Sequence, residues 1–228
     1  MKKPVVNYRE FRFSKLNTPE FSHLKYLFGW VVYFTLYFIT ENLISPERCH
    51  VIYSPLDDMI PFMEIFVIPY VLWYGLIVFS LTYFARYNID SFKKLQCFIM
   101  ITQAVAMVIY IVYPSKQELR PTEFANQNIL TDIIGFLYSF DTNTGVFPSL
   151  HVAYSVGIAS VWLKEKDASL VLRIIVAVFC FLVCISTAFI KQHSILDAFG
   201  AIPVCILAEA VLYGKYWRDK FKPKRQTT

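Results

Sequence analysis

Residues 170–197 read LVLRIIVAVFCFLVCISTAFIKQHSILD, and this stretch decides the fold. Residues 170–190 carry a single charge, and an apolar run of about 20 residues crosses a bilayer as a helix. His193 and Asp197 follow directly. Ionisable groups beside a membrane span are energetically costly and usually line a polar cavity. The stretch therefore predicts a transmembrane helix with a functional site at one of its ends.

The composition extends this prediction to the whole chain. Of its 228 residues, 56% are hydrophobic and 18% aromatic, which is too apolar for a soluble domain of this size. Six stretches are long and apolar enough to be spans: 24–45, 63–85, 95–113, 147–163, 170–190 and 194–214. We therefore expect an all-α integral membrane protein, a six-transmembrane-helix bundle. It divides into an amino-terminal segment (1–23), a catalytic membrane domain (24–214) and a mobile basic tail (215–228).

The basic residues alternate along the chain and predict its orientation. The amino-terminal tail, the second loop, the fourth loop and the carboxyl tail hold all but four of the 22 Lys and Arg residues. By the positive-inside rule these segments, and so both termini, are cytoplasmic. The site then faces outward, and the short tails favour a bacterial plasma membrane. The remaining four are Arg48, Lys116, Arg120 and Lys191.

The only long outward loop, about residues 114–146, lies between the third and fourth spans. Apolar residues recur in it at helical spacing, which predicts a short interfacial amphipathic helix: Ile129, Leu130, Ile133, Ile134, Leu137 and Phe140. Two interpretations stay open. The segment either packs over the bundle or helps to admit a lipid sideways.

Several residue types have structural interpretations. Four of the five cysteines fall inside predicted spans, so we expect no disulfide framework, and the Cys180/Cys184 pair is expected to pack rather than to bind metal. Trp30, Trp73 and the other two tryptophans (Trp162 and Trp217) are expected to be interfacial or packing residues, not a substrate cage. The net charge of +5 indicates anionic lipid headgroups, not nucleic acid, as the partner.

Three clusters fall at the outward ends of spans, where one pocket could collect them. They are Lys116 with Arg120-Pro121, then Pro148-Ser149-Leu150-His151, then Lys191-Gln192-His193. Ser149 is a typical helix N-cap, and the free N–H groups of a helix start attract anions. The Arg fork suits paired phosphate or carboxylate oxygens. We therefore expect Arg120, Lys116, Ser149, Leu150 and Lys191 to bind a phosphate.

The histidines supply the chemistry. His193 and Asp197 are four residues apart, so on a helix the carboxylate could accept a proton from one ring nitrogen and leave the other as a free lone pair. That is the requirement for a nucleophile or a general base. His151, from another span, is then a candidate general acid, because an ordinary imidazole changes protonation near neutral pH.

These motifs together resemble the type 2 phosphatidic acid phosphatase superfamily, whose motifs read K-x6-R-P, P-S-G-H and S-R-x5-H-x3-D. The second appears as Pro148-Ser149-Leu150-His151, and the third as Ser186-Thr187-x5-His193-x3-Asp197. The first keeps Arg120-Pro121, with Tyr113 where the family has Lys. The chain thus departs from the family at Tyr113, Leu150 and Thr187. The P-S-L-H form resembles the branch with inositol phosphotransferases that act on sphingolipids.

The resemblance implies a lipid phosphatase that works without a metal or other cofactor. His193 would become a phosphohistidine, Asp197 would orient it, and His151 would protonate the leaving alkoxide and then activate water. The substrate would be a lipid phosphate or diphosphate. One alternative is a lipid headgroup phosphotransferase of the inositol phosphorylceramide synthase type. A non-enzymatic alternative is a membrane protein in which His151 and His193 bind haem or a metal.

Overall fold

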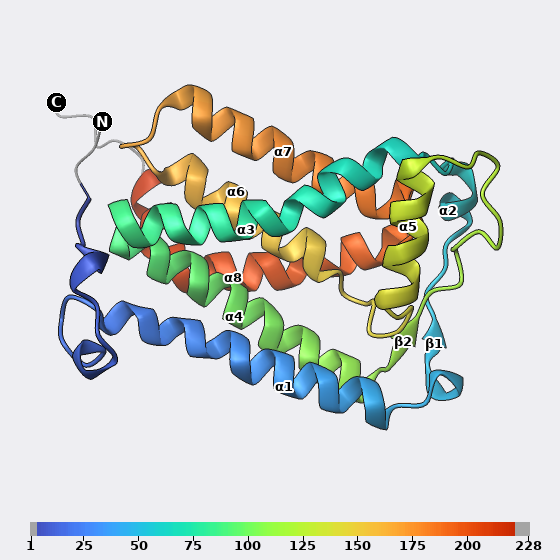
Figure 1. Ribbon diagram of the computed structural model, residues 1–228, viewed down its shortest axis with the longest axis horizontal. Helices are drawn as coiled ribbons and strands as arrows, with labels where there is room; N and C mark the ends of the chain where they lie inside the picture. Colours follow the sequence, from blue (N-terminus) through green and yellow to red (C-terminus); the bar gives the residue numbers. More distant parts are fainter. Residues whose placement is uncertain (1–3, 222–228) are drawn as a thin grey trace, which may run out of the picture.

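The computed structural model describes residues 4–221, and the chain is 72% helical and nearly all-α (Figure 1). The remaining residues, 1–3 and 222–228, include Lys2, Lys3, Lys222, Lys224 and Arg225, which were counted in the orientation argument. These five basic residues therefore lie outside the part of the chain that the structure describes.

Each of the six apolar stretches forms a helix. They are α1 (Phe28–Leu43), α3 (Val67–Tyr87), α4 (Ile89–Val112), α6 (Leu150–Lys164), α7 (Leu170–Phe189) and α8 (Ile195–Phe221). Within the described residues, four segments are long and apolar enough to cross a membrane: Glu64–Tyr87, Ile89–Val112, Leu170–Phe189 and Ile195–Arg218. The other two helices are shorter. At 1.5 Å per residue, the 16 residues of α1 and the 15 of α6 extend about 24 and 22 Å, less than the hydrocarbon thickness of about 30 Å.

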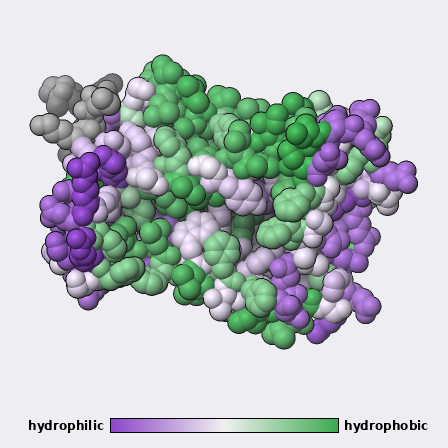
Figure 2. Space-filling view, viewed as in Figure 1, coloured by the Kyte–Doolittle hydropathy of each residue, from purple (hydrophilic) through white to green (hydrophobic). Residues whose placement is uncertain are grey.

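Helix α6 lies at the centre of the bundle and packs against α4, α7 and α8. Gly157 permits this packing, because a Cβ there would collide with the Phe98 ring of α4. Helix α1 lies at the edge, packs against α4 and buries none of its residues. Figure 2 shows a mainly apolar band along the bundle between two hydrophilic ends. Large apolar side chains such as Phe181 and Ile206 are exposed, as expected for helices that face lipid.

One end of the bundle carries both ends of the described chain (Figure 1). The amino-terminal segment is folded onto α3, because the Tyr8 hydroxyl donates to the Ala85 carbonyl at 2.8 Å and lies 2.6 Å from His23 Nε2. Helix α8 continues to Phe221, so the segment that was expected to be a tail from Lys215 onward is helical up to that residue. Short 3₁₀ turns complete the chain: Tyr8–Glu10, Phe13–Lys15, Ser22–Leu27, Pro46–Arg48 and Glu64–Phe66.

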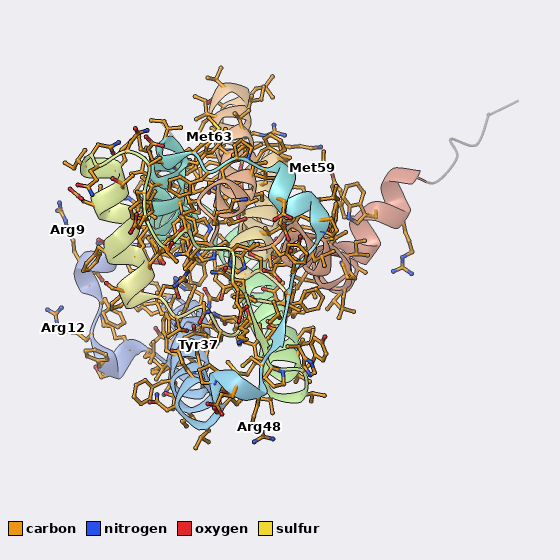
Figure 3. All side chains as sticks on the ribbon, turned by 90° about the vertical axis from the view of Figure 1, so that its right-hand side faces the viewer. Arg9, Arg12, Tyr37, Arg48, Met59 and Met63 are labelled. Atoms are coloured by element: carbon orange, nitrogen blue, oxygen red, sulfur yellow. The ribbon has the colours of Figure 1, made fainter. Side chains whose placement is uncertain are left out.

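The opposite end carries the connecting elements. Strands β1 (His50–Val51) and β2 (Ser115–Lys116) pair in parallel, and α2 (Pro55–Met59) follows β1. A helix, α5 (Ile129–Phe140), forms in the long loop, and it buries Ile134 against the end of the bundle in a cluster with α3 residues. Figure 3 looks onto this end, with Arg48 at its edge and Tyr37 further in.

Candidate active site

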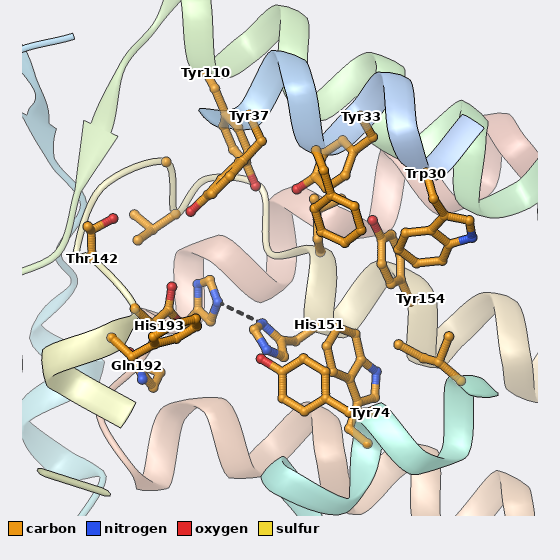
Figure 4. A pocket seen from close by; sticks show the side chains of 18 of the residues that line it. Trp30, Tyr33, Tyr37, Tyr74, Tyr110, Thr142, His151, Tyr154, Gln192 and His193 are labelled. Carbon is orange, nitrogen blue, oxygen red and sulfur yellow. Dashed lines mark hydrogen bonds between the residues drawn. The ribbon is translucent and has the colours of Figure 1, made fainter. Parts of the chain in front are cut away.

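The two histidines of the sequence motifs meet at the connector end of the bundle. His193 lies in the turn before α8, and His151 lies in the first turn of α6. His193 Nδ1 is 3.1 Å from Asp197 Oδ2, and its Nε2 is 3.3 Å from His151 Nδ1 (Figure 4). Because the carboxylate only accepts, Nδ1 of His193 carries the proton and Nε2 offers its lone pair. This tautomer leaves Nε2 of His193 unprotonated, as a nucleophile would require.

A helix cap, not a continuous helix, joins His193 to Asp197. Helix α8 begins at Ile195, so the expectation that both residues share a helical face is corrected. The Ser194 N–H donates to Asp197 Oδ2 at 3.0 Å, and the His193 N–H donates to the Thr187 carbonyl at 3.0 Å. One carboxylate oxygen therefore closes the first turn of α8 and holds the imidazole.

Asp57 was not recognised from the sequence. Its Oδ2 accepts from the Ser194 hydroxyl at 2.6 Å, and its Oδ1 accepts from the Ile195 N–H at 2.8 Å. The side chain is 2% exposed. Asp57 thereby fastens the α2 loop to the start of α8, next to His193. The Ser54-x-x-Asp57 spacing is typical of a capping box, but nothing in it indicates a contact 137 residues away.

Ser149 is the N-cap of α6, as predicted. Its Oγ accepts from the Val152 N–H at 3.4 Å, and its own N–H donates to the Asp197 carbonyl at 3.0 Å. The residue is fully buried. The Tyr110 hydroxyl donates to the Pro148 carbonyl at 2.9 Å and fixes the loop that leads into the helix. These bonds place His151 and Leu150 at the cavity described below.

The guanidinium of Arg120, a predicted phosphate contact, is bonded to protein groups in the structure. Its guanidinium donates to the carbonyls of Tyr138, Asp141 and Thr142 at 2.9 to 3.1 Å, and to Gln192 Oε1 at 2.6 Å. The first two carbonyls lie at the carboxyl end of α5, where helix carbonyls lack partners. Arg120 thus caps α5 and contacts three residues of the cavity described below, Asp141, Thr142 and Gln192, although it does not line that cavity itself.

The two predicted lysines are also engaged elsewhere. Lys191 adopts a positive φ of 54° and donates to the carbonyls of Asp57 and Ile60, at 2.6 and 2.5 Å. Lys116 lies in β2 and forms an ion pair with Glu118 at 2.7 Å. In this structure the three predicted cations therefore do not surround the histidines. Arg120 and Lys191 are bonded to protein carbonyls, and Lys116 is paired with a carboxylate.

The histidines open into a cavity of about 570 Å³ whose walls are mostly aromatic. The walls come from α1 (Trp30, Tyr33, Phe34 and Tyr37), from α3 (Trp73, Tyr74, Ile77, Val78 and Leu81), from α4 (Tyr110), from α5 (Phe140), from α6 (Leu150, His151 and Tyr154) and from the loops (Asp141, Thr142, Thr144, Gly145, Val146, Gln192 and His193). Trp30 and Trp73 pack in or against the hydrophobic core, as expected, and they also line this cavity. Trp162, in contrast, is buried in the core as expected.

Two of the aromatic residues hold His151 directly. The rings of Tyr70 and Trp73 lie 4.6 and 4.3 Å from the imidazole, measured between centroids. Both come from α3, three residues apart, so they project on one face of that helix. The ring of His151 is therefore fixed, and its Nε2 has no hydrogen-bond partner among the described residues.

Asp141 brings a carboxylate to the same cavity. It follows α5 as its C-cap. Burial raises the pKa of this carboxyl group, and the nearby His193 and Arg120 oppose that rise. The sequence carries no motif around Asp141, so its place in the cavity could not be predicted.

No protein-family model, no curated protein and no solved structure matches this chain. Among the residues that the structure describes, no three His, Cys, Asp or Glu side chains gather in a way that could hold a metal ion. The chemistry of the site is therefore inferred from its own geometry.

Proposed function

We propose that this protein is an integral membrane enzyme that cleaves a lipid phosphate ester through a covalent phosphohistidine. One observation carries the proposal. Asp197, His193 and His151 form a continuous chain of contacts at 3.1 and 3.3 Å beside an apolar cavity. A carboxylate that fixes the tautomer of a nucleophile, with an acid group alongside, is the arrangement that covalent catalysis requires.

In the proposed reaction, His193 Nε2 attacks phosphorus, and an N–P bond forms as the bond to the lipid oxygen breaks. The leaving alkoxide takes a proton from His151. Water then gives a proton to His151, attacks phosphorus and releases the phosphate, so His193 returns to its first state. Asp197 stabilises the positive charge that develops on His193 in both steps. This sequence is hydrolysis of a lipid phosphate or diphosphate, our first candidate, and it resembles that of the type 2 phosphatidic acid phosphatases.

Transfer of the headgroup to an alcohol is the second candidate, and the cavity favours it. None of the described residues that line it is Lys or Arg. A dianionic phosphate monoester bound there would lack the cations that normally compensate its charge. A phosphodiester carries one charge fewer, so it suits these walls better.

The proposed setting is a bacterial plasma membrane, which the protein crosses six times, with both termini inside and the site at the outer face. The four candidate spans and the mainly apolar band between the two hydrophilic ends support it. The short helix α6 fits as the central helix, since protein surrounds it on three sides and its start at Ser149 is capped inside the bundle. Under this orientation α5 lies over the outer end.

The first test is a phosphate-release screen with the purified protein over phosphatidate, phosphatidylglycerophosphate, polyprenyl diphosphate and a sphingoid phosphate, with and without an acceptor alcohol. His193→Ala should lower turnover at least about a thousandfold. His50→Ala is the matched control, because His50 is exposed in β1 and does not line the cavity. Retained turnover in His193→Ala contradicts the covalent mechanism. A visible absorption band or a bound metal in the purified protein would instead favour the haem or metal alternative.

A further inference from the structure

The cavity beside the histidines has chemistry of its own. Five tyrosines and two tryptophans contribute to its walls (Tyr33, Tyr37, Tyr74, Tyr110, Tyr154, Trp30 and Trp73). Figure 4 shows Tyr33, Tyr37 and Tyr110 on the side of the cavity opposite His151 and His193. A volume of about 570 Å³ exceeds what a phosphate requires, and it lies in the usual range for a complete small-molecule site.

Asp141 is the only acidic residue in the described lining of the cavity. Asp141 lines the cavity, and its carboxylate forms no ion pair with Lys or Arg among the described residues. Arg120 bonds to the carbonyl of Asp141 and to other carbonyls. Glu41 lies just beyond the wall, where its Oε1 accepts from the Tyr37 hydroxyl at 3.3 Å and from the Thr142 hydroxyl. The described lining thus offers ring faces and a carboxylate, next to histidines that can hold a phosphate.

We propose that this cavity binds the quaternary ammonium end of a zwitterionic phospholipid headgroup of the phosphocholine type, with its phosphate at His193. A quaternary ammonium group cannot donate conventional hydrogen bonds, and proteins recognise it with aromatic faces and negative charge. A primary ammonium group needs several acceptors aimed at it. The inference rests on the phosphoryl chemistry proposed for His193, and it selects a phosphodiester as the substrate.

The substrate defines which bonds change. His193 Nε2 attacks the phosphorus of the diester, the N–P bond forms, and the bond to the lipid alcohol breaks. That alkoxide takes the proton of His151 and leaves as a neutral lipid alcohol. Phosphocholine stays on His193 until an alcohol or water gives a proton to His151, bonds to phosphorus and breaks the N–P bond. The ammonium group remains between the rings and Asp141 throughout both steps.

A binding experiment tests this without turnover. Full-length His193→Ala protein in maltoside micelles is titrated with dodecylphosphocholine, dodecylphosphoethanolamine and dodecyl phosphate, and binding is followed by calorimetry and by tryptophan fluorescence, since Trp30 and Trp73 line the cavity. We expect dodecylphosphocholine to bind at least about tenfold more tightly than either of the others. Equal binding of all three, or preference for dodecyl phosphate or for the ethanolamine probe, overturns the inference.

Asp141→Asn supplies the second measurement. Asparagine keeps the shape and removes the charge, so binding of dodecylphosphocholine should weaken about tenfold while binding of dodecyl phosphate stays the same or improves. Misfolding cannot produce this reversal, because it would weaken both probes. Asp132→Asn is the matched control: Asp132 is an exposed residue of α5, and we expect no change. A loss of both probes in Asp141→Asn, or no change in either, contradicts the assigned role.

The two proposals can fail separately. If His193→Ala binds the choline probe selectively but the variant still turns over lipid, the phosphohistidine mechanism fails and the headgroup site stands. If the variant is inactive but shows no selectivity for choline, the mechanism stands and the headgroup site fails.

Discussion

The Oδ2 atom of Asp197 is shared by two donors, the His193 ring and the Ser194 N–H. The same oxygen therefore closes the first turn of α8 and fixes the proton on Nδ1 of His193. Asp197 thus serves both the stability of α8 and the orientation of His193. A substitution that removes only its charge can distinguish the two roles.

Asp197→Asn should keep the fold and lose activity. With the amide oxygen in the place of Oδ2, both donors keep their acceptor, but the negative charge that stabilises the cation on His193 is lost. We expect kcat to fall about a thousandfold or more, with little change in KM. Steady-state measurements of kcat and KM test this prediction. Asp132→Asn is the control, because it removes the same charge from an exposed residue of α5. A proportional rise in KM with normal kcat would show that Asp197 binds substrate instead.

Arg120→Ala tests whether this arginine supports the fold or holds phosphate. The substitution leaves the carbonyls of Tyr138 and Asp141 without their donor, so we expect the free energy of unfolding to fall by about 2–3 kcal/mol. Thermal unfolding in detergent measures it. Arg48→Ala is the control, since Arg48 is exposed at the same end. Normal stability together with a raised KM would restore the phosphate contact predicted from the sequence.

Asp141 gives a pH dependence with a definite sign. Burial raises the pKa of its carboxyl group in the folded protein above that in the unfolded chain. The folded state then holds this proton longer, so stability is fully present below the unfolded pKa of about 4 and declines as the pH rises through the folded pKa. Asp141→Asn should lack this decline and melt at a higher temperature at pH 7. If the melting temperature of Asp141→Asn depends on pH in the same way as that of the wild-type protein, the assigned effect of Asp141 on stability is contradicted.

Residue spacing alone was enough to select His151, His193, Asp197 and the Ser149 cap. It could not assign the cations, because the carbonyls that Arg120 and Lys191 cap belong to helix ends elsewhere in the chain. It also could not find Asp57 or Asp141, whose significance comes only from tertiary contacts.

At the scale of elements, apolar length predicted the position of every long helix but not its exact extent. Helix α8 continues past residue 214 because nothing in its sequence stops it until after Phe221, and α6 starts three residues late because Pro148 and the Ser149 cap set its first turn. Boundaries depend on caps, whereas helix existence depends on burial of apolar surface. The short α1 and α6 are the two predicted spans that do not belong to the four candidate spans among the described residues.

The crossing of α4 and α6 gives an element-scale prediction. Gly157→Ala places a methyl group against the Phe98 ring, so we expect it to destabilise the bundle by about 1–3 kcal/mol. Gly75→Ala is the matched control on α3, because its Cβ meets nothing within 4 Å and alanine favours the helix. Thermal unfolding of both variants in the same detergent measures the difference. Equal stability of the two would mean that α6 can move away from α4 at little cost.

The molecule as a whole has two unlike ends. The described termini and the turns between α3 and α4 and between α6 and α7 lie at one end, and the histidines, α2, α5 and the short strands lie at the other (Figure 1). An enzyme that takes a lipid from the bilayer needs its polar groups near the headgroups and its cavity beside the acyl chains. The aromatic cavity, with walls from both α1 and α3, fits that requirement.

The proposed orientation places the histidine end outside the cell, and single cysteines test it. Glu123 and Arg12 are exposed at opposite ends of the described chain. In intact cells, a membrane-impermeant maleimide should label Glu123→Cys and spare Arg12→Cys, whereas both should react after lysis. The wild-type protein controls for its five native cysteines, which are buried or half-buried. Labelling of Arg12→Cys alone would invert the orientation and place the reaction at the inner face, because the bundle crosses the membrane as one unit and both histidines lie at the Glu123 end.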